Sequence, residues 1–163
     1  MKKRLLAAAF ILSATTTQAA TYGRENNVTA LLGFTQTAMN FGANYERRLD
    51  TMGVGGYFHF SSEEKDNQIN RQTMSFGAMA PAHVLDDNRF DIYLAPGFGV
   101  TMIKGVATEN DETVFGPTIK TGMLFKFTPT VKAGIEHFYF TNWFNDKAQA
   151  SGQYTNAALS FAF

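Results

Sequence analysis

Residues 90–102 read FDIYLAPGFGVTM, and every second residue from Phe90 to Met102 is apolar. Successive side chains of a β-strand point to opposite faces, so this period of two predicts a strand with one apolar face. An amphipathic helix would instead repeat every 3.6 residues. The same alternation recurs in residues 28–34, 39–45, 54–60, 74–84, 115–127, 131–139 and 157–163. We therefore predict an all-β chain of eight strands.

The connections between these segments alternate in length. Residues 49–52, 85–89 and 128–129 are short and contain turn-forming residues, and the first connection, near residues 35–37, is also short. Residues 61–71, 104–113 and 141–153 are longer, polar and charged. Long loops at one rim and tight turns at the other predict an antiparallel up-and-down barrel with an even number of strands.

The two faces of the predicted strands differ in a way that orients the barrel wall. A soluble lipocalin-like barrel would enclose the apolar face and expose charged residues to water. Here the opposite face carries small, weakly polar residues such as Asn40, Gly42 and Asn44, and only 17% of the chain is charged. Large aromatic residues also gather at the segment ends, as in interfacial girdles. We therefore expect the apolar face to contact lipid, which makes this a transmembrane barrel.

The N-terminus has the pattern of an export signal. Three basic residues, Lys2 to Arg4, precede an apolar run to Leu12 and a small-residue cleavage site, which we place after Ala19 or one residue later. We predict a signal peptide at residues 1–19 and a barrel domain at residues 20–163. Without the signal, 11 basic and 14 acidic residues remain, a net charge of −3 that argues against nucleic-acid binding. The absence of cysteine excludes disulfides and thiolate chemistry.

An exported chain without cysteine, eight alternating segments and the final residues AALSFAF (157–163) together resemble the small outer-membrane β-barrels of Gram-negative bacteria, the OmpA/OmpX type. The resemblance covers nearly all of residues 24–163. It implies insertion into the cell outer membrane and contact with its lipid and lipopolysaccharide. It also implies recognition by the barrel-assembly machinery through the last strand, which ends in Phe163. It implies no activity, because no binding motif of the family is present.

If the apolar face contacts lipid, charged residues of the other face lie inside the barrel. This set comprises Glu46, Arg48, His59, Asp91, Lys120, Lys126, Lys132 and Glu136. Unpaired charges would be costly in so narrow a lumen, so we expect pairing. The tight turn at residues 128–129 places Lys120 opposite or diagonal to Glu136. The turn at residues 50–51 places Glu46 beside Gly55 and Asn44 beside Tyr57, and His83 and Asp91 approach each other across a third turn.

Two local expectations follow from the same assignment. Pro81, Pro96 and Pro117 each fall within a segment and remove a ladder hydrogen bond, so we expect a bulge at each. Leu94→Arg should cost about 2–4 kcal/mol in a bilayer, whereas Asn44→Ser, inside the barrel, should be mild.

We expect a structural or surface-interaction protein whose loops form the contact surface, without catalysis. No motif identifies the partner of the loops. Two alternatives remain open. One is a porin-like, narrow passive pore for small solutes or ions. The other is a lipid A-modifying, deacylase-like enzyme.

The enzymatic alternative depends on His137, which falls on the lipid-facing side of its strand. Residues 136–142 (EHFYFTN) are similar in placement to the site of outer-membrane deacylases, which carry a serine two residues after the histidine. Here that position is Tyr139, and Thr141 lies roughly 13 Å along the strand. No glutamate follows in the last segment. His59, His83 and His137 also lack the spacing of metal ligands. We therefore predict no catalytic, cofactor-binding or metal-binding residues and no cofactor.

Overall fold

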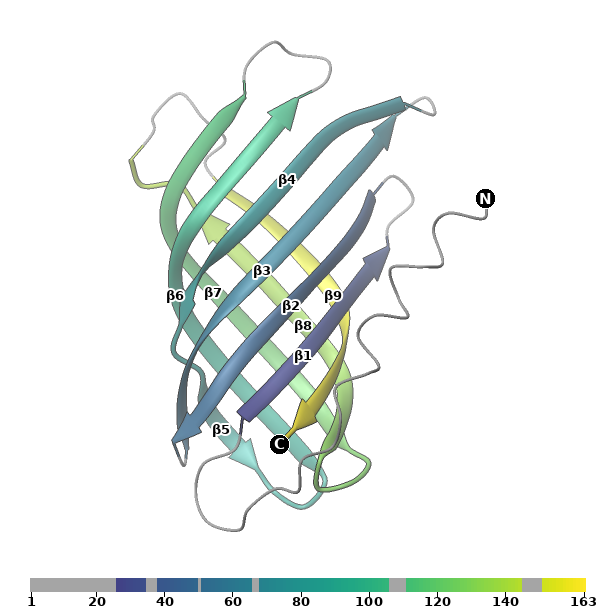
Figure 1. The fold of residues 1–163 in the computed structure, drawn as a ribbon, viewed down its shortest axis with the longest axis vertical. Helices are drawn as coiled ribbons and strands as arrows, with labels where there is room; N and C mark the ends of the chain where they lie inside the picture. The colour runs from purple at the N-terminus through teal and green to yellow at the C-terminus, as the bar shows by residue number, and fades with distance from the viewer. Residues whose placement is uncertain (1–25, 35–37, 50, 66–67, 106–110, 145–150) are drawn as a thin grey trace.

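The structure is a computed structural model that describes residues 26–34, 38–49, 51–65, 68–105, 111–144 and 151–163. The predicted signal peptide, residues 1–19, lies outside the described residues. Within the described part, the chain forms nine strands, as Figure 1 shows. Their bounds are β1 Asn26–Phe34, β2 Ala38–Leu49, β3 Met52–Lys65, β4 Gln68–Met79, β5 Ala82–Asp86, β6 Phe90–Gly105, β7 Glu112–Lys126, β8 Val131–Thr141 and β9 Ser151–Ala162. Among these residues, none forms a helix long and apolar enough to cross a membrane.

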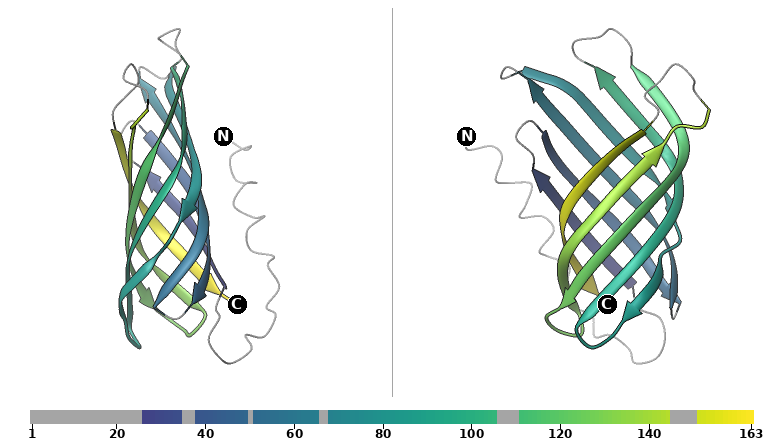
Figure 2. Two further views of the ribbon diagram at one scale, coloured as in Figure 1. Left: turned by 90° about the vertical axis from the view of Figure 1, so that its left-hand side faces the viewer. Right: turned by 180° about the vertical axis from the view of Figure 1, so that it is seen from behind.

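The strands close into one antiparallel barrel. Apart from β4 and β5, which do not pair with each other, each strand pairs with its sequence neighbour, and the first strand, β1, pairs with the last, β9. β4 and β5 occupy a single position in the wall, because both lie between β3 and β6 and are separated only at Ala80–Pro81. The nine strands therefore fill eight positions, which confirms the predicted eight-stranded up-and-down barrel. The barrel is flattened, since it is broad in Figure 1 and narrow in the left view of Figure 2.

The two ends of the barrel differ. The turn end, at the bottom of Figure 1, carries the tight connections near residues 50, 87–89 and 127–130 and the C-terminal residue Phe163, which exchanges two backbone hydrogen bonds with Asn26. The loop end, at the top, carries the other connections. The turn-end connections are short enough to fix the register of the strands that they join, and the predicted pairs Glu46↔Gly55 and Asn44↔Tyr57 are both confirmed.

At Pro81 the structure shows an interruption between β4 and β5 and no bulge, because the pairing with β3 and with β6 resumes at Ala82 in the same register. The register of β5 with β6 shifts only farther on, between His83 and Leu85. The Pro81 carbonyl accepts a hydrogen bond from the backbone N–H of Gly53, which ties this interruption to β3.

For Pro96 and Pro117 the predicted bulge is wrong, because the register between β6 and β7 continues unbroken through both. The Pro96 carbonyl accepts a hydrogen bond from the Ala80 N–H. The nitrogen and the carbonyl of a strand residue point to the same side, so the Pro96 nitrogen also faces the β4–β5 interruption. The Pro117 carbonyl accepts from the Thr141 hydroxyl, just beyond the end of the β7–β8 ladder. Each proline thus faces an edge where the ladder already ends, and its missing N–H breaks no regular pairing.

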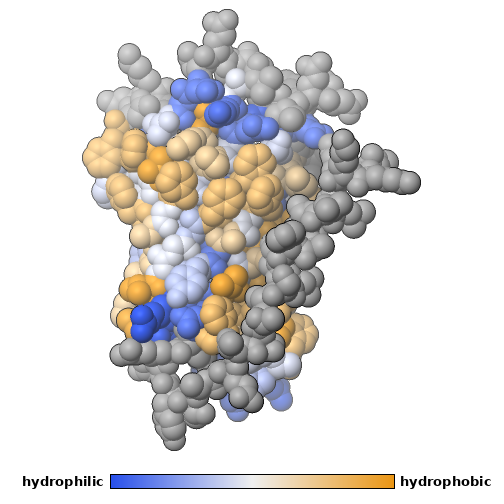
Figure 3. Space-filling model, viewed as in Figure 1, coloured by the Kyte–Doolittle hydropathy of each residue, from blue (hydrophilic) through white to orange (hydrophobic). Residues whose placement is uncertain are grey.

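Alternate residues of the strands point outward and are large and apolar. Leu94 on β6 is 44% exposed, and Phe41 and Ile119 are exposed to a similar extent on β2 and β7. Figure 3 shows such side chains in orange, in a broad band below the loop end and again near the turn end. Residues of the opposite parity, such as Asn40, Asn44 and Lys120, are buried. The structure therefore confirms the inside-out assignment: the apolar face of the wall points away from the barrel interior.

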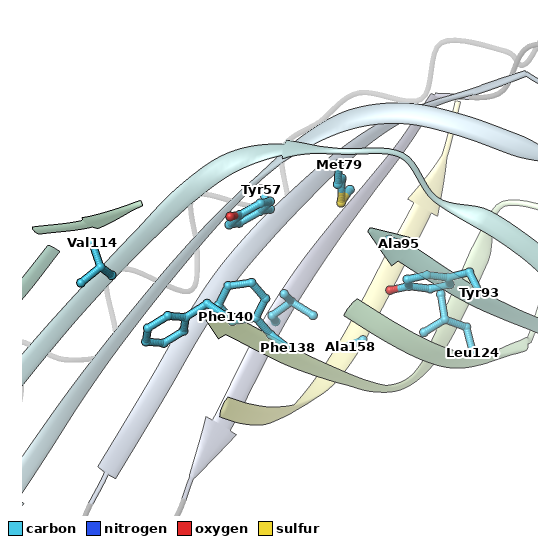
Figure 4. Close-up of a cluster of buried hydrophobic side chains, with 10 residues drawn as sticks. Tyr57, Met79, Tyr93, Ala95, Val114, Leu124, Phe138, Phe140 and Ala158 are labelled. Carbon is cyan, nitrogen blue, oxygen red and sulfur yellow. The ribbon is translucent and has the colours of Figure 1, made fainter. Parts of the chain in front are cut away.

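The interior is filled by side chains. Tyr57, Tyr93, Phe138 and Phe140 project from three strands into one apolar cluster (Figure 4). The ring of Phe138 lies 5.3 Å from that of Tyr57, between centroids. This cluster surrounds the buried charges described next, so it excludes water from them.

Candidate functional site

A fully buried ion pair lies in the middle of the barrel interior. Lys120 Nζ lies 3.0 Å from Glu136 Oε1, and neither side chain is exposed. The diagonal placement predicted across the turn at residues 128–129 is confirmed, because Lys120 pairs with Phe138 and Glu136 with Gly122. Lys120 Nζ also has partners on two other strands. It donates a hydrogen bond to Asn44 Oδ1 and lies 2.8 Å from His59 Nε2. The three donors of the lysine therefore all have acceptors.

The carboxylate of Glu136 is satisfied from two other strands. Its Oε2 accepts a hydrogen bond from Asn44 Nδ2 at 2.6 Å and a second from the Tyr93 hydroxyl. Tyr93 reaches it across Gly122, where a Cβ atom would lie 2.2 Å from the tyrosine ring. Because Gly122 has no side chain, the Tyr93 hydroxyl can approach the carboxylate of Glu136. Asn44, His59, Tyr93, Lys120 and Glu136 form what we call the central cluster.

Aromatic rings enclose the central cluster. Lys120 Nζ lies 4.8 Å from the centroid of the Tyr57 ring and 5.3 Å from that of Phe138. The imidazole of His59 stacks on Phe138 at 4.3 Å, with the two planes only 6° apart. A desolvated ion pair is stable only where its geometry is good and its remaining donors and acceptors are satisfied. The central cluster meets both conditions, so it holds five strands in a fixed arrangement.

A second group of charges lies towards the turn end. Asp91 contacts His83 Nδ1 at 2.5 Å and Lys132 Nζ at 2.9 Å, and His83 Nε2 contacts Glu46 Oε1 at 2.8 Å. The predicted approach of His83 and Asp91 is therefore confirmed. Arg48 and Lys126 both pair with Asp86, which lies nearer the rim. We call Glu46, Arg48, His83, Asp86, Asp91, Lys126 and Lys132 the turn-end cluster.

The predicted interior set is almost entirely buried. Lys126 is the exception, because its side chain is partly exposed beside Asp86 at the rim. The sequence did not identify Tyr93 or Asn44 as partners of Glu136. Their inward parity was available as a signal. Asn44 makes its contact across the barrel, whereas Tyr93 makes its contact over Gly122 of the intervening strand, β7.

Little open space remains beside these charges. The gap next to Asn27, Asn44, Glu46 and Tyr93 has a volume of about 20 Å³, which is room for about one water molecule. The two clusters and the surrounding rings therefore fill the turn-end half and the middle of the lumen. At the loop end, by contrast, a cavity of about 530 Å³ opens between the strands.

His137 points outward on β8, as predicted. Its Nδ1 lies 2.9 Å from the hydroxyl of Thr155, directly opposite on β9. The sequence offered no sign of this partner, because the two residues are 18 positions apart and meet only by strand pairing. Within the described ranges, no three His, Cys, Asp or Glu side chains are grouped so that they could hold a metal ion.

No protein-family model matches the sequence, and no curated protein matches it. Solved structures do match the fold. Neisserial surface protein A (NspA) has a TM-score of 0.64 and 14% identity, with 86% of this chain and 96% of that chain covered. The N-terminal β-barrel domain of Pseudomonas aeruginosa OprF has a TM-score of 0.65 and 12% identity, with 87% of this chain and all of that chain covered.

A third similar structure is Ail, the attachment invasion locus protein of Yersinia pestis, in complex with the heparin analogue sucrose octasulfate. Its TM-score is 0.56 at 12% identity, and 88% of this chain and all of that chain are covered. Identities this low show a shared fold and not a shared ligand. The closed antiparallel wall, the outward apolar face and these likenesses agree, and this chain has the fold of the small eight-stranded outer-membrane β-barrels.

Proposed function

We propose that this chain is exported by a signal peptide at residues 1–19 and inserted into the outer membrane of a Gram-negative bacterium, where it acts without catalysis as a structural or surface-interaction protein. The filled lumen is the observation that carries the proposal. Lys120 and Glu136 meet in the middle of the barrel with partners from three further strands, and the turn-end cluster continues the packing. The interior of an eight-stranded barrel is narrow enough for side chains to fill it, as they do here from the middle to the turn end.

The outer surface supports the membrane part of the proposal. Large apolar residues on every part of the wall face outward, and aromatic side chains such as Phe90, Phe125 and Phe127 pack together near the turn end. Aromatic belts of this kind lie at membrane interfaces. The predicted partners are therefore outer-membrane lipid and lipopolysaccharide, with the barrel-assembly machinery recognising the strand that ends in Phe163. Nucleic acid is not among the predicted partners.

The loop end supports the surface-interaction part. Charged side chains such as Glu64, Lys104, Asp111 and Glu112 lie there, beyond the apolar band. Ail, which shares the fold, is named for attachment and was crystallised with a heparin analogue. We therefore place the contact surface of this protein on its loops.

Cell fractionation combined with a cold detergent gel tests the proposed location and fold in cells. We expect the protein in the outer-membrane fraction, with a band that shifts on boiling because the closed barrel resists detergent until it is heated. A soluble periplasmic protein without a shift would overturn the proposal.

Planar-bilayer recording tests whether the lumen conducts. We expect no steady channel events, with a trimeric porin recorded in the same bilayer as the positive control. A stable conductance in the wild-type protein would favour the narrow-pore alternative.

Mass spectrometry of lipid A tests for catalysis. Cells expressing the wild type, His137→Ala or Thr155→Val should give identical lipid A spectra. A modification that is present with the wild type and lost in both variants would instead make the His137–Thr155 pair an enzymatic site.

A further inference from the structure

The barrel wall is incomplete beside the first hairpin at the loop end. The ladder between β1 and β9 ends at Leu32↔Ala157, and β1 itself ends two residues later, at Phe34. β9 begins at Ser151 and pairs with β8 from there onward. Six residues of β9 therefore extend past the ladder, and the nearest two, Asn156 and Thr155, still lie against Gly33 of β1. Among the described residues, β9 thus has no part of β1 beside it at residues 151–154, about 13 Å of strand. The right view of Figure 2 shows this part of β9 running away from the tip of β1. We call this gap the notch.

The cavity of about 530 Å³ lies at the notch, and both faces of the wall line it. Asn40, Thr73 and Tyr154 have the inward parity, whereas Phe34 and His137 point outward. Neighbouring residues of a strand face opposite sides, so a cavity enclosed by an intact wall would be lined by the inward parity alone. The mixed lining shows that the cavity connects the barrel interior with the outer surface through the notch.

The inner part of the cavity is polar and has no net charge. Asn40 is 3% exposed, and its Oδ1 atom has no hydrogen-bond partner among the described residues. Ser61, Thr73 and Tyr154 also line this part and contribute hydroxyl groups. Glu63 and Arg71 also line the cavity and lie directly opposite each other on β3 and β4. This part therefore offers hydrogen-bond donors and acceptors, with one charge of each sign.

The outer mouth of the cavity is apolar. Phe34 lines it and is 66% exposed. Leu32, Met39 and Phe41 also point outward from the same hairpin, because Phe34 pairs with Met39 and Leu32 with Phe41. An apolar strip thus begins at the cavity mouth and continues down the wall into the band that faces lipid.

We propose that the notch binds a single-chain amphiphile. Its head, which is uncharged or zwitterionic and rich in hydrogen-bonding groups, occupies the cavity beside Asn40 and Tyr154. Its hydrocarbon chain leaves sideways past Phe34 and lies on the apolar strip. The balanced charges of Glu63 and Arg71 favour such a head over one with a net charge. The inference rests on the proposed membrane location and adds to it a ligand held within the wall.

Photo-crosslinking in nanodiscs tests the site directly. The probe is lysophosphatidylcholine with a diazirine in its acyl chain, added in trace amounts to phosphatidylglycerol nanodiscs that hold the folded protein. We expect the crosslinks to concentrate in residues 32–34, 38–41 and 151–155, and unlabelled lysophosphatidylcholine to compete better than lysophosphatidylglycerol. Crosslinks spread evenly around the wall would overturn the proposal.

A covalent closure of the notch provides the sharper test. Extending the β1–β9 register places Phe34 opposite Thr155, and the chain contains no cysteine. In the double variant Phe34→Cys/Thr155→Cys, oxidation should reduce crosslinking about tenfold and a reductant should restore it. The single variant Phe34→Cys, oxidised in the same way, is the control for the loss of the phenyl ring. Crosslinking that persists in the disulfide form would contradict a lateral entry.

A variant inside the cavity keeps the test independent of disulfide formation. Asn40→Leu should reduce crosslinking about tenfold, because the head loses a buried amide partner. Thr118→Val is the matched control, since Thr118 is equally buried and also has an unpartnered oxygen but does not line the cavity. Equal crosslinking in both variants would refute the site. The heat-induced gel shift of each variant shows separately whether the barrel is intact, so a failure of binding is distinct from a failure of the proposed function.

Discussion

The interior of this barrel is built in two different ways above and below its middle. From the central cluster to the turn end, the inward side chains are charged, paired and covered by a wall in which β1 and β9 are joined and β4 and β5 are interrupted only at Ala80–Pro81. Near the loop end the inward side chains are mostly hydroxyls and amides, and the wall is open beside β1. The difference follows from desolvation, because a buried ion pair is stable only where water is excluded. The closed part therefore holds the fold together, and the open part is where a ligand has access.

The largest effect is expected from breaking the central ion pair. Lys120→Met leaves Glu136 buried without its cation, which should cost about 3–5 kcal/mol of unfolding free energy. Urea titration in lipid vesicles measures this cost, with the fluorescence of Trp143, the only tryptophan, as the signal. The double variant Lys120→Met/Glu136→Met should recover most of the loss, because it removes both charges. If the single variant lost less than the double, the pair would not be what stabilises the closed part.

A charge on the outside of the wall should be costly in a depth-dependent way. Leu94→Arg places a guanidinium on the apolar band and should cost about 2–4 kcal/mol in a bilayer. His137→Arg, near the notch and the loop end, should cost only about 0–1 kcal/mol. The same vesicle titration compares the two, with Leu94→Met as the control for side-chain shape. Similar costs for both arginines would mean that the notch lies as deep in the membrane as Leu94.

The same substitution, asparagine to serine, can be made in the closed part at Asn44 and in the open part at Asn40. Asn44→Ser removes an acceptor from Lys120 and a donor to Glu136, so it should cost about 1–3 kcal/mol. This revises the mild effect expected from the alternation alone, since the structure places Asn44 between two buried charges. Asn40→Ser, in the open part, should change stability by less than about 0.5 kcal/mol. A larger cost at Asn40 would show that the cavity lining also stabilises the fold.

The smallest effect is expected outside the wall, in the turn between β5 and β6. The backbone N–H groups of Phe90 and Arg89 donate to Asp87, and these bonds hold the pKa of its carboxyl below the ordinary value. Because the folded-state pKa is the lower one, the stabilisation is present above the unfolded pKa and is lost as pH falls through the folded pKa. The stability difference between wild type and Asp87→Ala should therefore be small at pH 7 and shrink in acid. Thermal melts at several pH values measure it, and a difference that grows in acid would contradict the assignment.

Sequence alone determined the features that depend on neighbouring residues. A period of two fixes which side chains share a face, and tight turns fix the register of the strands that they join. These two rules were enough to predict eight antiparallel strands, an outward apolar face and a buried charged set. They also predicted the diagonal meeting of Lys120 and Glu136 and the approach of His83 to Asp91. Each of these contacts is made across a single turn or within one hairpin.

Only the tertiary structure decided the contacts made across the barrel. Asn44 on β2 reaches Glu136 on β8 from the far wall, and the distance between walls depends on how the closed sheet is tilted and flattened, which no local pattern encodes. Closure also set where the ladder between β1 and β9 ends, and with it the notch. Strand alternation shows which way a side chain points. What it meets there depends on the shape of the whole barrel, because its partners come from strands that are distant in sequence.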